Sequence, residues 1–246
     1  MARRYPSVEG RWHTSVMRVD PNSASMVALR ERVAELLEGK RVVLAFQDQL
    51  SLAAIGFLPV IRERLNGAAT TEDEAFESCC DRETDVLLVT ERLEHGRGVD
   101  LVRRVREARP SCVCLYFLWT ETPEAVALAL DAGAQGVMFI STLGTGIGDF
   151  SKALSVCFNG GVYYPTNIRL AAKKLAPPHR AVSLSPRELD VLKLIGEGFP
   201  NPSIAEELGI GLETVKSRVK AVIEKLDARD RTHAAVVGVR LGILEP

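Results

Sequence analysis

The 246-residue sequence has no long hydrophobic run and no excess of either charge. Its longest apolar stretch, from Val113 to Trp119, is far shorter than the roughly 18 residues that a membrane-spanning helix needs. The 31 basic and 32 acidic residues give a net charge of −1, so any nucleic-acid binding must come from a local group of cations. The first four residues include two arginines, but no apolar stretch of signal-peptide length follows them. We therefore expect a soluble, cytoplasmic protein.

Cysteine and histidine are scarce. The five cysteines are an odd number, which argues against a disulfide framework. Cys112 and Cys114 lie two residues apart on a predicted strand, and Cys79 and Cys80 are adjacent, so neither pair has the spacing of a zinc site. The four histidines form no ligand cluster with them. Buried, reduced thiols are a better interpretation than metal binding or redox sensing. We expect neither a metal nor a cofactor.

Composition and periodicity divide the chain into four segments. Apolar residues make up 46% of the sequence, which is enough for a buried core in each of two domains. Residues 1–40 are an N-terminal extension whose later part, from Ser23 to Gly39, has helical apolar spacing. Two roles fit this helix equally: packing on the following domain, or pairing two subunits. Residues 176–182 contain two adjacent prolines and predict a linker between residues 41–175 and residues 183–246.

Short apolar runs alternate with helical patterns between residues 41 and 175. Four runs, with a weaker fifth near residues 67–70, predict buried parallel strands at residues 42–45, 86–89, 113–117 and 137–140. Helical patterns separate them at residues 50–65, 72–81, 98–108, 123–132 and 149–159. Five strands alternating with five helices predict a doubly wound α/β domain with right-handed crossovers.

The last segment is helical throughout. Residues 185–188 have the serine, proline and glutamate of a helix capping box, and the helix that they start runs to about Glu197. Residues 201–208 predict a short helix, Gly209 a tight turn, and residues 213–226 a longer helix. A short helix, a glycine turn and a long helix are typical of a helix-turn-helix domain.

The longer helix has one apolar side and one polar side. The apolar stripe, which must face the domain core, consists of Val215, Val219, Val222, Ile223 and Leu226. The other side has small residues at its centre and cations around it: Thr214, Lys216, Ser217, Arg218, Lys220 and Ala221. This pattern suits insertion into a DNA major groove. A merely solvated helix face is the alternative, because Glu213 and Glu224 dilute the charge.

The stretch from Leu184 to Ala205, LSPRELDVLKLIGEGFPNPSIA, followed by GIGLETVK up to Lys216, resembles the DNA-binding domain of LuxR/NarL-type regulators. The resemblance implies a four-helix domain that binds DNA as a dimer. It places base contacts at Lys216, Ser217 and Lys220, with Thr214 and Arg218 beside them. Arg218 stands where the family more commonly has histidine, and Pro202 where it more commonly has lysine. The closing helix, residues 231–244, is implied to dimerise through Val236, Val237, Leu241 and Leu244.

The middle segment resembles a response-regulator receiver of the NarL/FixJ type. The similarity lies in the scaffold, notably AGAQG at residues 132–136 and GGVYYP at residues 160–165. A working receiver needs two carboxylates and an acceptor aspartate for Mg²⁺ and phosphoryl chemistry, with a hydroxyl and a lysine nearby. The resemblance aligns these positions, in chain order, with Phe46, Gln47, Thr90, Leu118 and Ile140. We therefore expect a pseudo-receiver that is not phosphorylated.

Two other readings of the middle segment remain open. Asp48, Asp85 and Glu91 lie near strand ends and are candidates for a rebuilt metal site, although surface loops commonly carry acids. The glycine run GTGIG at residues 144–148 is a candidate phosphate cradle, but it lacks the GxGxxG spacing and follows the last strand instead of the first. We favour a loop there.

The sequence thus predicts a non-enzymatic, dimeric, sequence-specific transcription regulator that is controlled independently of aspartyl phosphorylation. Its expected partners are double-stranded DNA, a second copy of the chain, and a protein or small ligand on the pseudo-receiver. One alternative is a phosphorelay regulator with a displaced acidic acceptor. Another is a protein-interaction regulator that does not bind DNA.

Overall fold

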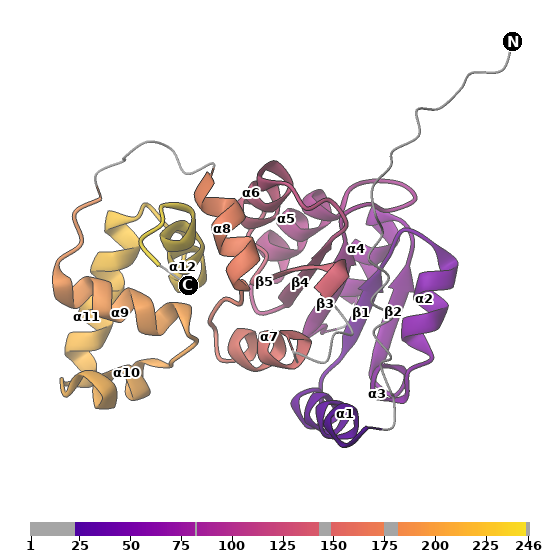
Figure 1. Cartoon of the computed structure of the whole chain (residues 1–246), viewed down its shortest axis with the longest axis horizontal. Coiled ribbons are helices and arrows are strands. Elements are labelled where there is room, and N and C mark those ends of the chain that lie inside the picture. Colours follow the sequence, from indigo (N-terminus) through magenta and orange to yellow (C-terminus); the bar gives the residue numbers. More distant parts are fainter. Residues whose placement is uncertain (1–22, 82, 143–148, 175–181, 245–246) are drawn as a thin grey trace, which may run out of the picture.

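The computed structural model describes residues 23–81, 83–142, 149–174 and 182–244. Its core is one parallel sheet flanked by helices, and a smaller helical domain lies beside it (Figure 1). The glycine run at residues 144–148, where we favour a loop over a phosphate cradle, lies outside the described residues, as do residues 1–22 and most of the predicted linker. Among the described helices, none combines the length and hydrophobicity needed to cross a membrane.

The sheet has five parallel strands in the order β2-β1-β3-β4-β5. Their bounds are β1 Val42–Ala45, β2 Leu65–Ala69, β3 Val86–Thr90, β4 Val113–Leu118 and β5 Gly136–Phe139. The predicted doubly wound α/β domain is therefore confirmed. In such sheets the order in which the strands are added reverses between β1 and β3, and the carboxyl ends of these strands form a crevice there.

The helices of this domain follow the predicted alternation with one correction and one omission. Their bounds are α2 Gln49–Gly56, α3 Pro59–Arg62, α4 Glu72–Asp81, α5 Gly98–Ala108, α6 Pro123–Asp131, α7 Asp149–Phe158 and α8 Thr166–Lys174, with a 3₁₀ turn at Ile140–Thr142. The single helix predicted over residues 50–65 was wrong. Its chain breaks after Gly56, because Pro59 lacks the amide that would continue α2 and instead begins α3. Helix α8 was not predicted.

Side chains alternate between the two faces of the sheet. Leu87, Tyr116 and Leu118 point to the face covered by α4, α5, α6 and α8. Leu44 and Leu88 point to the opposite face, which α2, α3 and α7 cover together with α1, Ala24–Leu36. Helix α1 contacts α7 and α3, and its Val33 and Leu37 are buried in this second core. The predicted amphipathic helix thus packs on the domain that follows it.

The C-terminal domain contains α9 Pro186–Gly196, α10 Asn201–Leu208, α11 Leu212–Lys225 and α12 Arg231–Arg240. The predicted capping box is present. The Ser185 amide donates to Glu188 Oε2 at 2.7 Å, and the Glu188 amide donates to Ser185 Oγ at 3.4 Å. Gly209 ends α10 with a φ of +61°, a left-handed conformation that glycine adopts without steric cost. Helices α10 and α11 therefore form the predicted helix-turn-helix.

One hydrophobic core runs through both domains. Helix α12 contacts α6 and α8 of the sheet domain, and Ile168 and Ala172 of α8 join the same cluster as Leu192 of α9 and Val239 of α12. Polar contacts lie around this apolar interface between the two domains. An ion pair of 3.4 Å joins Arg106 Nη2 of α5 to Asp230 Oδ2, the N-cap of α12. A second ion pair joins Asp131 to Arg240.

Candidate DNA-binding surface and the pocket at the sheet edge

Helix α11 separates its apolar and polar residues as the sequence predicts. Val215 and Val222 have no exposed surface and Val219 has 9%, so the apolar stripe is in the core of the C-terminal domain. The small residues Thr214 and Ser217 are exposed on the other side. Lys216 and Lys220 are exposed around them. A helix held by three valines thus presents two cations and two hydroxyls to solvent.

Both lysines form ion pairs along the helix. Lys216 Nζ lies 2.7 Å from Glu213 Oε1, and Lys220 Nζ lies 3.9 Å from Glu224 Oε1. More than half of each of these side chains is exposed, and exposed pairs typically contribute less than about 1 kcal/mol. A phosphate or base acceptor can therefore replace either glutamate at small cost.

Arg218 differs from the other cations of α11. Its side chain is half-buried, and its Nη1 atom is buried without a hydrogen-bond partner among the described residues. The five residues predicted to meet DNA are thus brought onto one helix, but Arg218 lies at the edge of the exposed face.

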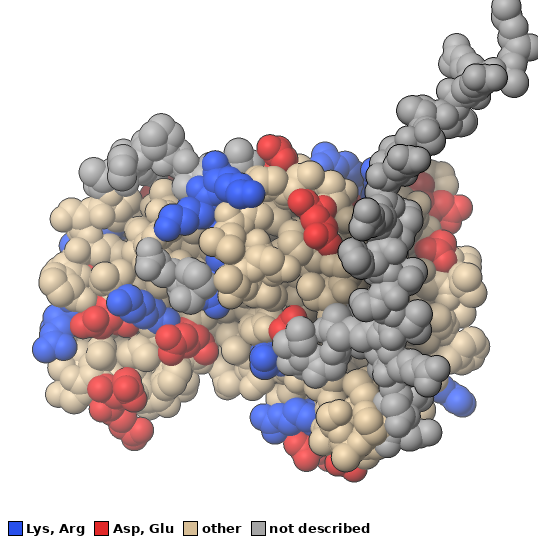
Figure 2. All heavy atoms as spheres, in the orientation of Figure 1, with Lys and Arg blue, Asp and Glu red and all other residues tan. Residues whose placement is uncertain are grey.

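The two sides of the C-terminal domain have different surroundings. Helix α11 lies on the side away from the sheet, whereas α12 lies between α11 and the sheet domain (Figure 1). In Figure 2 the surface of the C-terminal domain, on the left, mixes blue and red side chains, in agreement with the near-neutral net charge. Of the predicted dimerisation residues, Val236 and Leu244 are buried and Val237 and Leu241 are half-buried. The predicted reading face is open while the predicted dimerisation helix is covered.

Four of the five aligned receiver positions meet at the carboxyl edge of the sheet. Phe46, Gln47, Thr90 and Ile140 line one cavity of about 450 Å³. The Thr90 hydroxyl is turned to the main chain: Oγ1 donates to the carbonyl oxygen of Arg92 at 2.9 Å. The acceptor position thus holds a buried hydroxyl that is already hydrogen-bonded.

Leu118 does not belong to this cavity, and the expectation that it lies with the other four was wrong. Its side chain is 1% exposed and points to the opposite face of the sheet, where it lines a separate pocket with Tyr116 and Leu128. Because side chains alternate along a strand, Phe117 is the β4 residue that faces the cavity.

The three acids considered for a rebuilt metal site are separated and engaged. Asp48 caps α2 and accepts from the Ser51 amide and hydroxyl, both at 2.8 Å, and these bonds lower the pKa of the carboxyl. Asp85 precedes β3, at the other edge of the sheet, and accepts from the Arg41 amide. Glu91 Oε2 accepts from the amides of Trp119 and Thr120 at 3.2 and 2.9 Å. In the part of the chain that the structure describes, no group of His, Cys, Asp and Glu is arranged to hold a metal ion.

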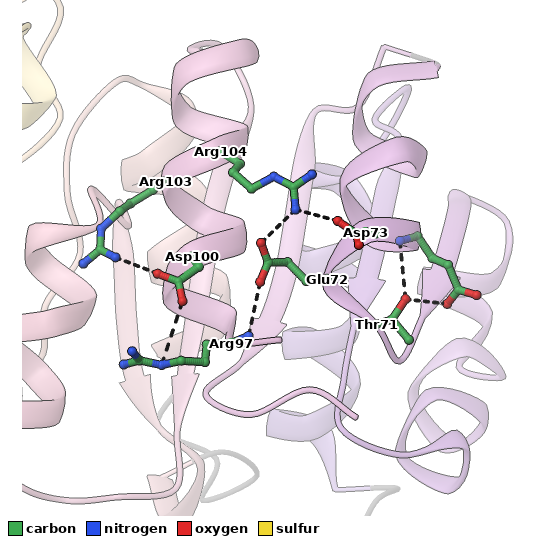
Figure 3. Close-up of polar contacts among 8 residues, drawn as sticks. Thr71, Glu72, Asp73, Arg97, Asp100, Arg103 and Arg104 are labelled. Carbon is green, nitrogen blue, oxygen red and sulfur yellow. Dashed lines mark hydrogen bonds and ion pairs between the residues drawn. The ribbon is translucent and has the colours of Figure 1, made fainter. Parts of the chain in front are cut away.

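The loop after β3 is tied to α4 and α5 by a polar network (Figure 3). Arg104 of α5 donates to Glu72 Oε1 and Asp73 Oδ1, each at 2.8 Å, and its guanidinium lies 4.2 Å from the centre of the Phe76 ring. Glu72 Oε2 in turn accepts from the Arg97 amide at 3.3 Å. The bond to Arg97 ties the loop that carries Glu91 to the start of α4.

Sequence reasoning did not find three aromatic residues of the cavity or the contribution of α1. Phe117, Trp119 and Phe150 line it together with Met26 and Leu29 of α1. A signal for α1 was present, since its apolar residues have helical spacing. Where that apolar face would pack was not visible in the sequence.

Comparison with known proteins shows similarity to bacterial regulatory proteins. Residues 182–237 match the family model described as bacterial regulatory proteins, luxR family. The chain is 28% identical over 218 residues to the transcriptional regulatory protein LnrK of Bacillus subtilis, covering 82% of this chain and 98% of LnrK. It is also 28% identical over 176 residues to the nitrate/nitrite response regulator NarL of Escherichia coli K12, covering 69% and 80% of the two chains.

A solved structure of the response regulator RcsB of Salmonella typhimurium aligns over 81% of this chain and 97% of RcsB, with 21% identity and a TM-score of 0.45. Residues 182–237 form a regulatory domain of the luxR family, in a chain that is homologous to response regulators such as LnrK and NarL.

Proposed function

We propose that this protein is a sequence-specific, DNA-binding transcription regulator that reads the major groove with α11. The observation that carries the proposal is the separation of buried apolar residues from exposed polar residues on α11, within a luxR-family domain. Its valines are buried, while Thr214, Lys216, Ser217 and Lys220 are exposed on the open side of the molecule. An α-helix fits the major groove, where lysines reach base edges or phosphates.

We further propose that control of this regulator does not use aspartyl phosphorylation. The acidic positions of a receiver are Phe46 and Gln47, and the acceptor position is a threonine whose hydroxyl donates to the main chain. A displaced acidic acceptor is the alternative. The hydrogen bonds that Ser51 donates to both carboxylate oxygens of Asp48 argue against that residue, because an acceptor needs an oxygen lone pair aimed at the phosphoryl group.

Dimerisation through α12 is the third part of the proposal. In this structure the two domains are packed against each other, which we call the closed arrangement. Helix α12 packs on α6 and α8 there, so a second subunit cannot reach the face of α12 that contacts them. Dimerisation through the face of α12 that packs on α6 and α8 would therefore require the C-terminal domain to leave the sheet domain. The ion pairs of Arg106 with Asp230 and of Asp131 with Arg240 would break in that step.

The test is a measurement of DNA affinity with matched charge variants. An operator found by chromatin immunoprecipitation and sequencing is labelled, and binding is followed by fluorescence anisotropy. The double variant Lys216→Ala/Lys220→Ala should bind at least tenfold more weakly, which is about 1.4 kcal/mol. The control Lys152→Ala/Lys174→Ala removes the same charge from exposed positions on α7 and α8 and should bind like the wild type.

Two results would count against the proposal. Unchanged affinity of the α11 variant would exclude this helix as the reader and would favour a protein-interaction regulator. Equal losses in both double variants would show that binding follows net charge and not the α11 surface.

A further inference from the structure

The cavity at the sheet edge is closed by the helix that precedes the receiver-like domain. Its floor is the sheet, with Leu88 and Phe117 at 3% and 5% exposure. Helix α1 forms one wall with Met26, Leu29 and Val33, and α2, α3 and α7 form the others. In Figure 1 α1 and α3 lie together below the sheet, with α7 to their left and α2 on the right. The strand order reverses between β1 and β3. Trp119, 62% exposed, stands at the opening.

The interior of the cavity is apolar. Apart from Arg30, Gln47, Asp48, Ser51 and Thr90, every described residue that lines it has an apolar side chain. Three of these polar groups are already engaged: Asp48 and Ser51 bond to each other, and the Thr90 hydroxyl donates to the main chain.

The remaining two polar residues, Arg30 and Gln47, are exposed, so they lie at the rim. The interior therefore offers no free charge to pair with an ion, and an ion buried there without a partner is strongly disfavoured.

The cavity has the size of a small-molecule site. Its volume of about 450 Å³ lies inside the range of roughly 300–1,000 Å³ that ligand pockets usually have. A protein partner would need an interface of about 800 Å² on each side, much more than this opening presents. The rings of Phe117 and Phe150, with centroids 6.4 Å apart and planes inclined by 37°, form an apolar cleft within it.

From these observations we propose that the cavity binds an uncharged, mainly apolar small molecule, with a polar group of that molecule at the rim beside Gln47. Burial of apolar surface between α1 and the sheet supplies the affinity. The absence of a counter-ion in the interior supplies selectivity against molecules that would bury a charge there.

Helix α7 connects this cavity to the interface between the domains. Phe150, in its first turn, lines the cavity, and Val156, further along, contacts Gly198 of the C-terminal domain. A ligand that moves α7 would therefore act on the domain contact. This regulatory use rests on the proposed function, whereas binding itself does not.

Binding is tested with 1-N-phenylnaphthylamine, an uncharged dye whose fluorescence rises in apolar surroundings. The full-length protein should bind it saturably with one site per chain. Ile55→Trp places a larger side chain at a half-buried position that faces the cavity, and should weaken dye binding at least tenfold. Leu50→Trp lies on the same helix, is 80% exposed and lines no part of the cavity, so it should leave dye binding unchanged.

A second measurement keeps the test valid if the first variant is unstable. The sequence contains two tryptophans, so Trp12→Phe leaves Trp119 as the sole intrinsic reporter at the cavity mouth. Saturating 1-decanol should shift its emission to the blue, whereas decanedioate at the same concentration should not, because one of its two charges would have to enter the apolar interior.

Three outcomes would overturn the proposal: no saturable dye binding, equal binding by the Ile55→Trp and Leu50→Trp variants, or equal emission shifts with the alcohol and the decanedioate. None of these titrations contains DNA, so a failure of the proposed function would leave their results unaffected.

Discussion

Gly161 and Gly198 bring the main chains of the two domains into direct contact. A Cβ atom on Gly161 would lie 2.4 Å from the Cα and 2.5 Å from the nitrogen of Gly198. Gly198 itself has a φ of +88°, a conformation that residues with a side chain rarely adopt. Close by, the Val162 amide donates to the Gly196 carbonyl at 3.4 Å. Both glycines are needed for the domains to lie this close.

The first prediction concerns that contact. Gly161→Ala forces two backbones apart and should destabilise the closed arrangement by about 1–3 kcal/mol, the usual cost of overpacking. Differential scanning calorimetry should show a lower melting temperature. Gly56→Ala is the matched control, because its nearest atom would be Leu65 Cδ2 at 3.8 Å, an ordinary contact. Equal melting temperatures for Gly161→Ala and the wild type would disprove the close contact.

Phosphorylation provides a second prediction. Incubation of the protein with acetyl phosphate and Mg²⁺ should leave its mass unchanged, because the carboxylate positions hold Phe46 and Gln47 and the acceptor position holds Thr90. Intact mass spectrometry measures this, with a phosphorylatable response regulator in a parallel reaction as control. An acid-labile phosphoryl adduct on the sheet domain would contradict the prediction.

The apolar side of α11 should respond differently from its polar side. Val219→Asp places a charge at a position with 9% exposure in the domain core, so it should unfold the C-terminal domain. Lys220→Ala changes a side chain that is 79% exposed and should leave the melting temperature nearly unchanged. Circular dichroism during heating compares the two variants. If Val219→Asp melts like the wild type, the assignment of the buried side is wrong.

Acid should weaken the capping box of α9. The bonds of Glu188 to Lys225 and to the Ser185 amide lower its pKa from 4.5 to about 2. Because the folded-state pKa is the lower one, this carboxylate stabilises the fold fully above about pH 4.5, and the contribution is lost as the pH falls towards 2.

Glu188→Gln removes this titrating group and should cost about 1 kcal/mol at pH 7, with a smaller difference from the wild type at pH 3. Urea unfolding at the two pH values measures the change. Glu206→Gln, at an exposed position on α10, is the control and should show no such dependence. A pH-independent deficit in Glu188→Gln would exclude the carboxylate as the cause.

Much of the fold was predictable because its signals are local. The apolar runs of the strands and the capping residues of α9 determine their elements largely without help from the rest of the chain. The face on which Leu118 lies was not predictable, because all six residues of β4 are buried and a uniformly apolar strand has no inward and outward pattern. Helix α8 was missed for the opposite reason: only Ile168 and Ala172 of its nine residues are buried, which is too weak a periodicity to recognise.

The two candidate sites also differ in how far local sequence determines them. The α11 face follows from one helix and could be read from its sequence alone. The cavity is formed by segments as distant as Met26, Phe117 and Phe150, and only the tertiary structure brings them together. The break between α2 and α3 could have been predicted from the sequence, because Pro59 has no backbone amide with which to continue α2.

The core that passes through α8 from the sheet to α9 and α12 makes the closed molecule a single cooperative unit. When it opens, apolar surface from Ile168, Ala172 and Val239 becomes hydrated, and hydration of such surface raises the heat capacity. The balance between closed and open forms should therefore depend on temperature with pronounced curvature. Burial of this shared apolar surface should therefore make the packing of the two domains itself depend on temperature.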